Sequence, residues 1–201
     1  CIRDSIYSLL KLSSEKFKIL LPRRLTTLKS QEIFIESHNL LKTKYNKENF
    51  QAIILGSHQG RKVYFKKLIS AVEKYGLREK VFFLQHIKEM PIAYYVSDVV
   101  VSSSIESEAF GRISVEAQAM RRPILASNHG GSTETIVNGK SGFLFENNNP
   151  ESLAENLNKL IEMDKDKLQS IGNEGRKNIL HKFDVEKMCF STYLEYKKLI
   201  N

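Results

Sequence analysis

The sequence has few of the residues that crosslink small secreted domains or bind metals. Its 201 residues include only two cysteines, Cys1 and Cys189, at opposite ends of the chain and without a Cys-x-x-Cys pair. A disulfide framework and a zinc site are therefore not expected. The five histidines lack the spacing of metal ligands, so we expect no metal site and place them in loops or at the surface.

Long hydrophobic runs are absent as well. The longest, such as 53–55 and 99–101, fall far below the roughly 20 residues that a bilayer-spanning helix needs. The chain begins with Cys1, without Met or a charged-then-apolar leader. We therefore expect a water-soluble, cytoplasmic protein in a reducing compartment, and we expect these residues to be part of a longer chain.

Positive charge is unevenly distributed. The chain carries 31 Lys and Arg against 23 Asp and Glu, for a formal net charge of +8, and the excess lies entirely within residues 1–100. Such an excess can attract nucleic acid, anionic lipid or a phosphorylated ligand. Many of these lysines, such as Lys66, Lys67 and Lys74, fall in segments of helical pattern. We interpret them as solvated surface charge and expect no nucleic-acid partner.

Short apolar runs alternate with longer amphipathic stretches along most of the chain. The pattern predicts strands at 17–21, 50–55, 81–84, 99–102, 123–126 and 142–145, and helices at 30–44, 60–75, 91–97, 114–120, 150–163, 166–180 and 185–200. Runs that are apolar at every position need cover on both faces. We therefore predict an α/β fold: a Rossmann-like open parallel sheet with helices on both faces and a helical C-terminal third. Residues 13–201 would form this domain, and 1–12 a linker or tail from a preceding one.

The segment from Ser104 to Met120 holds the most informative pattern. It follows a predicted buried strand and opens a helix, so the free N–H groups of the helix N-terminus would face the carboxyl edge of the sheet, where they can hold a phosphate. Gly111 allows the backbone to approach a ligand closely. Glu108 and Glu116 lie on either side of it, so both are placed to contact a ligand at the helix N-terminus.

This segment resembles the signature of the family 4 retaining glycosyltransferases, which have the GT-B fold of two facing Rossmann-like domains. The resemblance is to the C-terminal, donor-binding domain, and further segments carry it: Leu21–Lys29, Leu55–Ser57, Asp98–Ser102, Gly130–Ile136 and Gly139–Leu144. It implies that the chain is one half of a GT-B enzyme. That enzyme would transfer a hexosyl group from a nucleoside diphosphate sugar, of UDP or GDP type, to an acceptor hydroxyl, with retained configuration and without a metal or other cofactor.

The resemblance also implies roles for individual residues. Glu108 would bond a hydroxyl of the donor sugar beside the reacting carbon, and Glu116 would bond the ribose hydroxyls. Arg24 and Lys29 match the cations that grip the diphosphate, so with Glu108 they form the predicted catalytic set. The predicted donor-binding residues are Gly56, Phe110, Gly111, Arg112 and Ile113, with His86 and Ile87 beside the base.

Four positions depart from the family pattern. Arg23, Ser30, Gln85 and Arg121 stand where the family commonly has glycine. If such a position needs a positive φ, a side chain there costs roughly 1 to 2 kcal/mol. The two arginines also add charge to loops that would form the site. A degenerate, non-catalytic copy therefore stays open as an alternative.

Two other functions stay open. A GT-B nucleotide-sugar epimerase shares the scaffold, but it needs catalytic acids and bases that the segment from Glu108 to Glu116 does not explain. A basic binding domain is favoured only by the net charge. On the glycosyltransferase interpretation, an acceptor glycan or glycolipid would bind an absent N-terminal domain, and the amphipathic segment 185–200 would pack toward that domain. This fragment alone would then be inactive, and the resemblance allows the full-length protein to associate peripherally with the inner face of a membrane.

Overall fold

Six parallel strands form the centre of the molecule. The computed structural model describes residues 12–85 and 87–200. The strands are β1 (Phe17–Pro22), β2 (Phe50–Leu55), β3 (Val81–Leu84), β4 (Val99–Ser102), β5 (Ile124–Ser127) and β6 (Phe143–Phe145), and their order in the sheet is β3-β2-β1-β4-β5-β6. The order reverses between β1 and β4. In open α/β sheets, ligands bind beyond the carboxyl ends of the strands at such a reversal.

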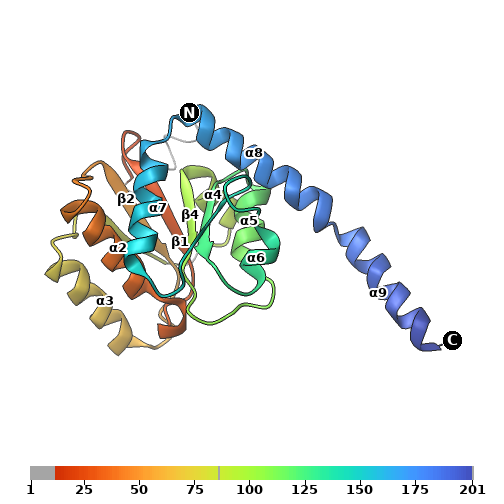
Figure 1. Cartoon of the computed structure of the whole chain (residues 1–201). Coiled ribbons are helices and arrows are strands. Elements are labelled where there is room, and N and C mark those ends of the chain that lie inside the picture. The colour runs from red at the N-terminus through yellow and green to blue at the C-terminus, as the bar shows by residue number, and fades with distance from the viewer. Residues whose placement is uncertain (1–11, 86, 201) are drawn as a thin grey trace.

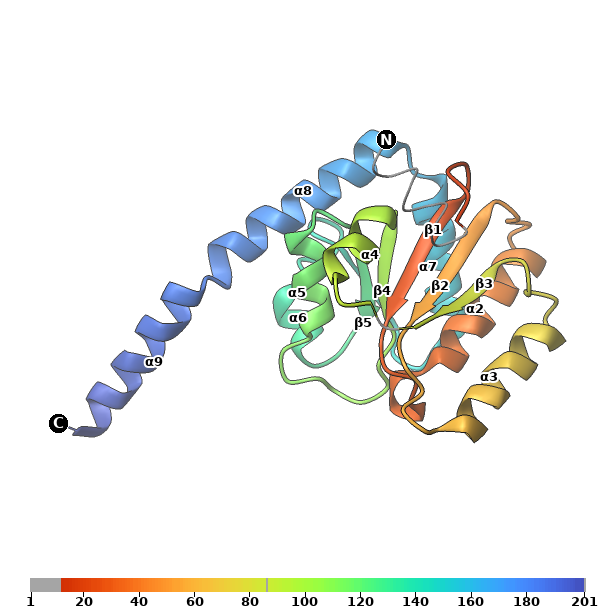
Figure 2. The ribbon, with the colours of Figure 1, turned by 180° about the vertical axis from the view of Figure 1, so that it is seen from behind.

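Helices cover both faces of this sheet (Figures 1 and 2). One face packs against α2 (Gln31–Thr43), α3 (Lys62–Lys74) and α7 (Pro150–Glu162), and the other packs against α4 (Met90–Val96) and α5 (Arg112–Ala119). The remaining helices are η1 (Thr27–Lys29), α6 (Gly131–Thr135), α8 (Lys165–Lys182), which packs on α5, and α9 (Val185–Ile200).

The strand sequences explain this two-sided cover. In β4, Val99 and Val101 belong to the core on the α2 face, whereas Val100 belongs to the core on the α4 face, and all three are fully buried. A strand buried on both faces needs an apolar residue at every position rather than at every second one. The predicted fold class is confirmed, and each predicted strand or helix lies within two residues of its observed bounds.

Helix α9 differs from the others because it projects from the body of the molecule (Figure 2). Its apolar side chains are exposed, among them Met188 at 63%, Tyr196 at 64% and Leu199 at 83%. Packing of this segment against a further domain stays a prediction. Among the described residues, no helix has both the length and the apolar character that crossing a bilayer requires.

The prediction that the histidines lie in loops or at the surface is wrong for His38. This residue lies on the buried face of α2, is fully buried, and packs between the rings of Phe34 and Phe50. Its Nδ1 donates a hydrogen bond to the carbonyl of Phe34 at 2.5 Å. Burial lowers the pKa of His38 to about 4, so the ring is neutral and serves as an aromatic core residue.

The four positions where glycine was expected behave in two ways. Ser30 and Arg121 are in the left-handed region, with φ of 49° and 56°. Neither Arg23 nor Gln85 is among the described residues with positive φ. Backbone strain therefore applies to Ser30 and Arg121, whereas the consequence of Arg23 comes from its side chain.

Candidate functional site

A groove of about 690 Å³ lies at the carboxyl ends of β1, β2 and β4. Ligand pockets in proteins commonly have volumes of about 300 to 1,000 Å³. Most of the predicted site residues line this groove, namely Arg24, Lys29, Gly56, Glu108, Phe110, Gly111, Arg112, Ile113 and Glu116. The groove also lies where the strand order reverses, so topology and side chains mark the same place.

Two predicted base contacts are not in this set. His86 lies outside the described residues. Ile87 is half-buried and packs against the core on the α4 face, and it is not among the residues that line the groove.

The loop after β4 places Glu108 in the lining of the groove. The Glu108 carbonyl accepts a hydrogen bond from the N–H of Gly131, at the start of α6, with an N···O distance of 2.7 Å. This approach requires glycine, because a Cβ on Gly131 would lie only 2.5 Å from the backbone carbon of Phe110. The double glycine at 130–131 thus lets α6 support the loop that carries Glu108.

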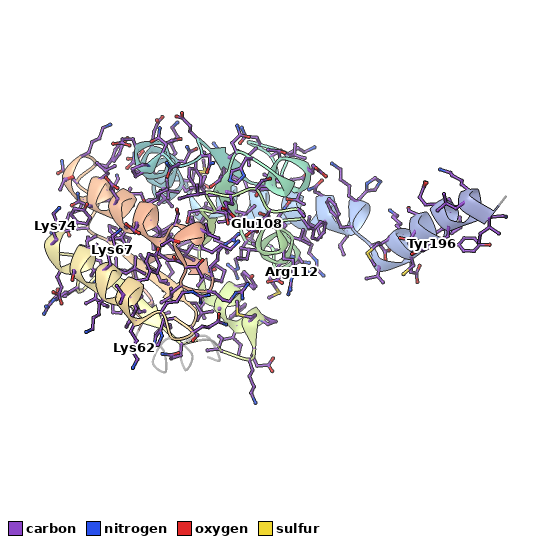
Figure 3. The ribbon with its side chains drawn as sticks, turned by 90° about the horizontal axis from the view of Figure 1, so that it is seen from below. Lys62, Lys67, Lys74, Glu108, Arg112 and Tyr196 are labelled. Atoms are coloured by element: carbon purple, nitrogen blue, oxygen red, sulfur yellow. The ribbon has the colours of Figure 1, made fainter. Side chains whose placement is uncertain are left out.

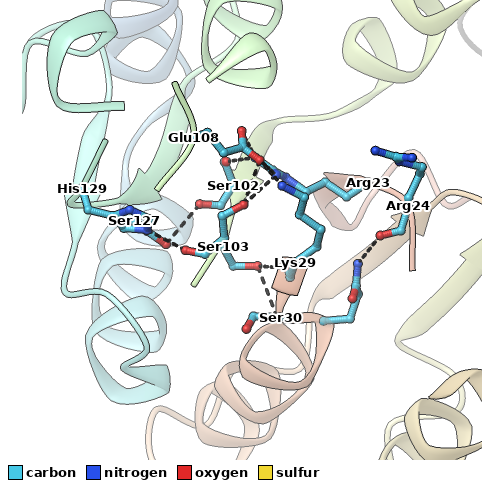
Figure 4. Close-up of polar contacts among 11 residues, drawn as sticks. Arg23, Arg24, Lys29, Ser30, Ser102, Ser103, Glu108, Ser127 and His129 are labelled. Carbon is cyan, nitrogen blue, oxygen red and sulfur yellow. Dashed lines mark hydrogen bonds and ion pairs between the residues drawn. The ribbon is translucent and has the colours of Figure 1, made fainter. Parts of the chain in front are cut away.

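The Glu108 carboxylate is surrounded by cations and hydroxyls (Figure 4). Both of its oxygens accept hydrogen bonds from Arg23, Lys29 forms an ion pair with it, and the Ser104 hydroxyl donates to it at 3.0 Å. Burial raises the pKa of Glu108, but the hydrogen bonds and charges of Arg23 and Lys29 outweigh this effect and lower the pKa to about 2. Glu108 is therefore ionised throughout the physiological pH range.

Glu116 also lines the groove, and its carboxylate accepts a hydrogen bond from a neutral donor. It lies on α5, which begins after Gly111. The φ of Gly111 is 70°, a backbone conformation that favours glycine. The buried Tyr94 hydroxyl donates to Glu116 Oε2 at 2.6 Å, and the exposed Arg112 lies 3.3 Å from Oε1. Burial, and then the bond to Glu116, raise the pKa of Tyr94, so the hydroxyl keeps its proton.

Positive groups line the same groove as the two glutamates. The N-terminus of α5 has no side-chain cap. The N–H of Ser114 donates to the Gly111 carbonyl at 2.9 Å, so the N–H groups of the two preceding residues, Arg112 and Ile113, are the ones that can meet a ligand. Lys29 enters the groove from η1, and Arg24 lines its wall with an exposed side chain. Within residues 12–85 and 87–200, the Arg24 guanidinium has no hydrogen bond or ion pair. Four cations, Arg23, Arg24, Lys29 and Arg112, face two carboxylates, so the groove favours an anion.

The lysines of α3 do not extend this positive region. Lys62, Lys67 and Lys74 lie on the outer side of α3, away from Glu108 and Arg112 (Figure 3). Lys67 is paired with Glu32 at 2.6 Å. They are solvated surface charges, as predicted from the sequence.

The family of the chain follows from comparison with known proteins. The family model for glycosyl transferases group 1 matches residues 7–178. The chain belongs to this family.

Solved structures share the fold, and one of them is named as a member of the same family. HepE from Anabaena, solved in complex with UDP and glucose, is 26% identical with a TM-score of 0.88; the match covers 98% of this chain and 52% of HepE. The C-terminal domain of LpcC from Francisella tularensis is 28% identical with a TM-score of 0.78, and the match covers 91% of this chain and 93% of that domain. The chain therefore corresponds to the C-terminal, Rossmann-like half of a GT-B glycosyltransferase.

Two curated relatives are glycosyltransferases as well. The capsular polysaccharide biosynthesis glycosyltransferase CapM of Staphylococcus aureus is 36% identical over 103 residues, which are 51% of this chain and 27% of CapM. A D-inositol 3-phosphate glycosyltransferase of Paenarthrobacter aurescens is 28% identical over 93% of this chain and 45% of its own length. The chain spans about half the length of such relatives or less.

Sequence reasoning missed two residues of this glycosyltransferase site. The sequence marks Arg23 as a departure from glycine that adds charge to a site-forming loop, but it does not predict the direct contact of Arg23 with Glu108. Tyr94 was treated as part of an amphipathic helix, yet it positions Glu116. Nothing in the local sequence pairs Arg23 with Glu108, because the two are 85 residues apart.

The described part of the chain holds no cluster of three or more His, Cys, Asp or Glu side chains that suits a metal ion. One Asp-x-Asp sequence, Asp164-Lys165-Asp166, lies at the start of α8, far along the chain from the groove residues. There the Asp164 carboxylate accepts the N–H of Lys167 at 2.7 Å, which is the geometry of a helix cap.

Proposed function

We propose that this chain binds a nucleoside diphosphate sugar, of UDP or GDP type, in the groove between Glu108 and Glu116. The observation that carries the proposal is the set of groups that line one groove: the carboxylates of Glu108 and Glu116 together with Lys29, Arg24 and the N-terminus of α5. A nucleoside diphosphate sugar has matching groups, because its anionic diphosphate joins two parts that are rich in hydroxyls.

The two glutamates suit the two hydroxyl-bearing parts of the donor. Carboxylate oxygens accept hydrogen bonds from neighbouring hydroxyls, as on a ribose or a hexose. We assign the nucleoside to Glu116 and the sugar to Glu108, which agrees with the roles that the family resemblance implies. The complex of HepE with UDP and glucose supports a donor of this class for a chain that shares its fold.

The central cations suit the chemistry of transfer. Cleavage of the bond between sugar and phosphate increases the negative charge on the leaving diphosphate. Lys29, Arg24 and the N–H groups of α5 would stabilise that charge more strongly in the transition state than in the ground state, which is the condition for acceleration. These groups supply the stabilisation without a metal ion, so we propose a metal-independent mechanism.

We extend this proposal from the donor-binding chain to the whole enzyme. We propose that it is a hexosyltransferase that retains the configuration of the donor and uses an acceptor bound by residues outside this chain, since the chain spans about half of HepE. The 201 residues alone would then bind donor without transferring sugar. An acceptor of the cell envelope, a cytoplasmic location and a peripheral contact with the inner membrane face stay predictions.

Calorimetric titration of the chain with UDP, GDP and ADP tests the proposal. We expect one nucleotide to bind with a Kd in the micromolar to millimolar range, and we expect Lys29→Ala to weaken its binding about tenfold through loss of a charged contact to phosphate. Lys74→Ala is the matched control, because it removes the same charge from the exposed outer side of α3.

The control separates a specific site from general attraction by a basic protein. Equal losses in Lys29→Ala and Lys74→Ala would contradict a site in the groove. Absence of binding by all three nucleotides, both to this chain and to the full-length protein, would contradict the proposed function.

A further inference from the structure

A buried cation, Arg23, contacts Glu108 in the lining of the groove (Figure 4). The Arg23 side chain is only 4% exposed, and its terminal nitrogens donate to both oxygens of Glu108. The same nitrogens donate to the hydroxyls of Ser102 and Ser104, each at 2.6 Å. A bidentate guanidinium–carboxylate pair is strong and has a fixed geometry, so Arg23 and Glu108 form a rigid unit.

Lys29 contacts the same carboxylate in a weaker arrangement. Its Nζ meets only Oε1 of Glu108, an oxygen that already accepts hydrogen bonds from Arg23 and Ser104. The Lys29 side chain is 26% exposed and lines the groove. Lysine also has a flexible stem, whereas Arg23 is anchored at four points. Of the two cations on Glu108, Lys29 is therefore the one that can turn to a ligand.

A phosphate in the groove would compete with Glu108 for Lys29. If Lys29 were the only cation on Glu108, its departure would leave a half-buried carboxylate without a counter-charge. The loss of one partner from a buried ion pair is costly. With Arg23 present, both oxygens of Glu108 stay hydrogen-bonded whichever group Lys29 contacts.

We propose that Arg23 is a positioning residue that holds Glu108 as a charge-compensated carboxylate and thereby releases Lys29 to the diphosphate of the donor. The inference rests on the proposed function, because it takes a nucleoside diphosphate as the occupant of the groove. Arg23 acts through Glu108 and Lys29. Its loss should therefore change how strongly substitutions of those two residues affect nucleotide affinity.

A set of variants measured with the nucleotide that the wild type binds tests this role. We expect Arg23→Gln to weaken nucleoside diphosphate binding about tenfold, because Lys29 then stays on Glu108. Arg23→Gln/Glu108→Gln should return the affinity to within about threefold of the wild type, because the competing carboxylate is gone. A merely structural role of Arg23 does not predict that a second substitution at the site restores binding.

The effect of Lys29→Ala gives an independent readout. In the wild type it should cost about tenfold in affinity, but in the Arg23→Gln background less than about threefold, since Lys29 no longer serves the ligand there. Arg23→Lys keeps one cation on Glu108, so it should retain the wild-type response to Lys29→Ala. It also provides the comparison if Arg23→Gln does not fold, as judged by circular dichroism.

The outcomes separate this inference from the proposed function. Wild-type affinity in Arg23→Gln, failure of Glu108→Gln to restore binding, or an equal cost of Lys29→Ala in both backgrounds would overturn the role of Arg23 alone. If Arg23→Gln is unfolded, a lost response to Lys29→Ala in Arg23→Lys would overturn it. No nucleotide binding by the wild-type chain or the full-length protein would overturn the proposed function and the inference together.

Discussion

The two glutamates that line the groove are held by different means. Glu108 lies in a loop and is fixed by two cations, one of them buried, whereas Glu116 lies on α5 and receives a hydrogen bond from the neutral Tyr94 hydroxyl. A loop residue has no helix to set its direction, so charge and hydrogen bonds must do so. A helical residue is already directed by its backbone, so one buried hydrogen bond and the exposed pair with Arg112 are enough for Glu116.

This difference has a chemical consequence. At Glu108 the charge is compensated within the protein, so the carboxylate can stand beside a reacting centre without repelling the nearby diphosphate. At Glu116, Oε1 has only the exposed Arg112 at 3.3 Å, and it keeps accepting capacity for hydroxyls. We therefore expect Glu108 to govern the rate of transfer and Glu116 to govern nucleotide affinity.

Loss of the Glu108 carboxylate should have the largest effect. In the full-length protein, Glu108→Gln should lower kcat by about 100-fold or more, because it removes a charge beside the reacting carbon, while nucleoside diphosphate affinity changes less than about threefold. Glu106→Gln, an exposed neighbour in the same loop, is the matched control. A Glu108→Gln variant with wild-type kcat and weakened nucleotide binding would reverse the roles assigned to Glu108 and Glu116.

Loss of the Glu116 carboxylate should act on affinity. Glu116→Ala should weaken binding of a ribonucleoside diphosphate about tenfold, because hydrogen bonds from ribose hydroxyls to a charged acceptor are lost. The 2′-deoxy nucleotide should show a smaller loss, since it lacks one of these hydroxyls. Titration of both nucleotides into the wild type and the variant gives the two losses of affinity. Equal losses for the two nucleotides would contradict a contact between Glu116 and the ribose.

A smaller effect is expected from the partner of Glu116. Tyr94→Phe removes the hydroxyl and keeps the buried ring, so affinity should fall about threefold through looser placement of the carboxylate. Tyr95→Phe, on the same helix and 43% exposed, should leave the affinity unchanged. An unchanged Kd in Tyr94→Phe would show that the backbone of α5 alone positions Glu116.

The smallest effect concerns stability in acid. The folded-state pKa of Glu108, about 2, lies below its ordinary value of 4.5, so the unfolded chain takes up the proton first as pH falls. The stability that Glu108 contributes is present above about pH 4.5 and is lost toward about pH 2. The free energy of unfolding should therefore fall less between pH 6 and pH 3 in Glu108→Gln than in the wild type, as urea titrations can measure. A fall of the same size in both proteins would contradict the paired state of Glu108.

The sheet and its helices could be predicted because their signals are local. Continuous apolar runs such as Val99–Val101 mark strands covered on both faces, and amphipathic spacing marks the helices between them. Helix α5 begins two residues before the predicted start because Gly111, at a φ of 70°, allows the helix to begin directly after it. The pattern of α2 did not predict that His38 serves as a core aromatic residue. Histidine counts as a polar residue in such a pattern, although the His38 ring packs between Phe34 and Phe50.

The site could be predicted only in part. Residues in one motif, such as Glu108 and Glu116, are placed by the strand that precedes the Glu108 loop and by the helix that follows it. Arg23 and Tyr94 come from other elements, and their contacts depend on how β1 and α4 meet the loop after β4 and α5. The family pattern commonly has glycine at position 23, and glycine has no side chain from which the place of an arginine could be inferred. The sequence therefore marks Arg23 as unusual but does not show where its guanidinium lies.

A crystal structure of the chain with its bound nucleoside diphosphate tests the central claim most directly. The account predicts the diphosphate between Lys29 and the N-terminus of α5, with ribose hydroxyls within hydrogen-bond distance of Glu116 and Glu108 still paired with Arg23. A nucleotide in the reverse direction, with its ribose at Glu108, or one bound outside the groove altogether, would contradict it.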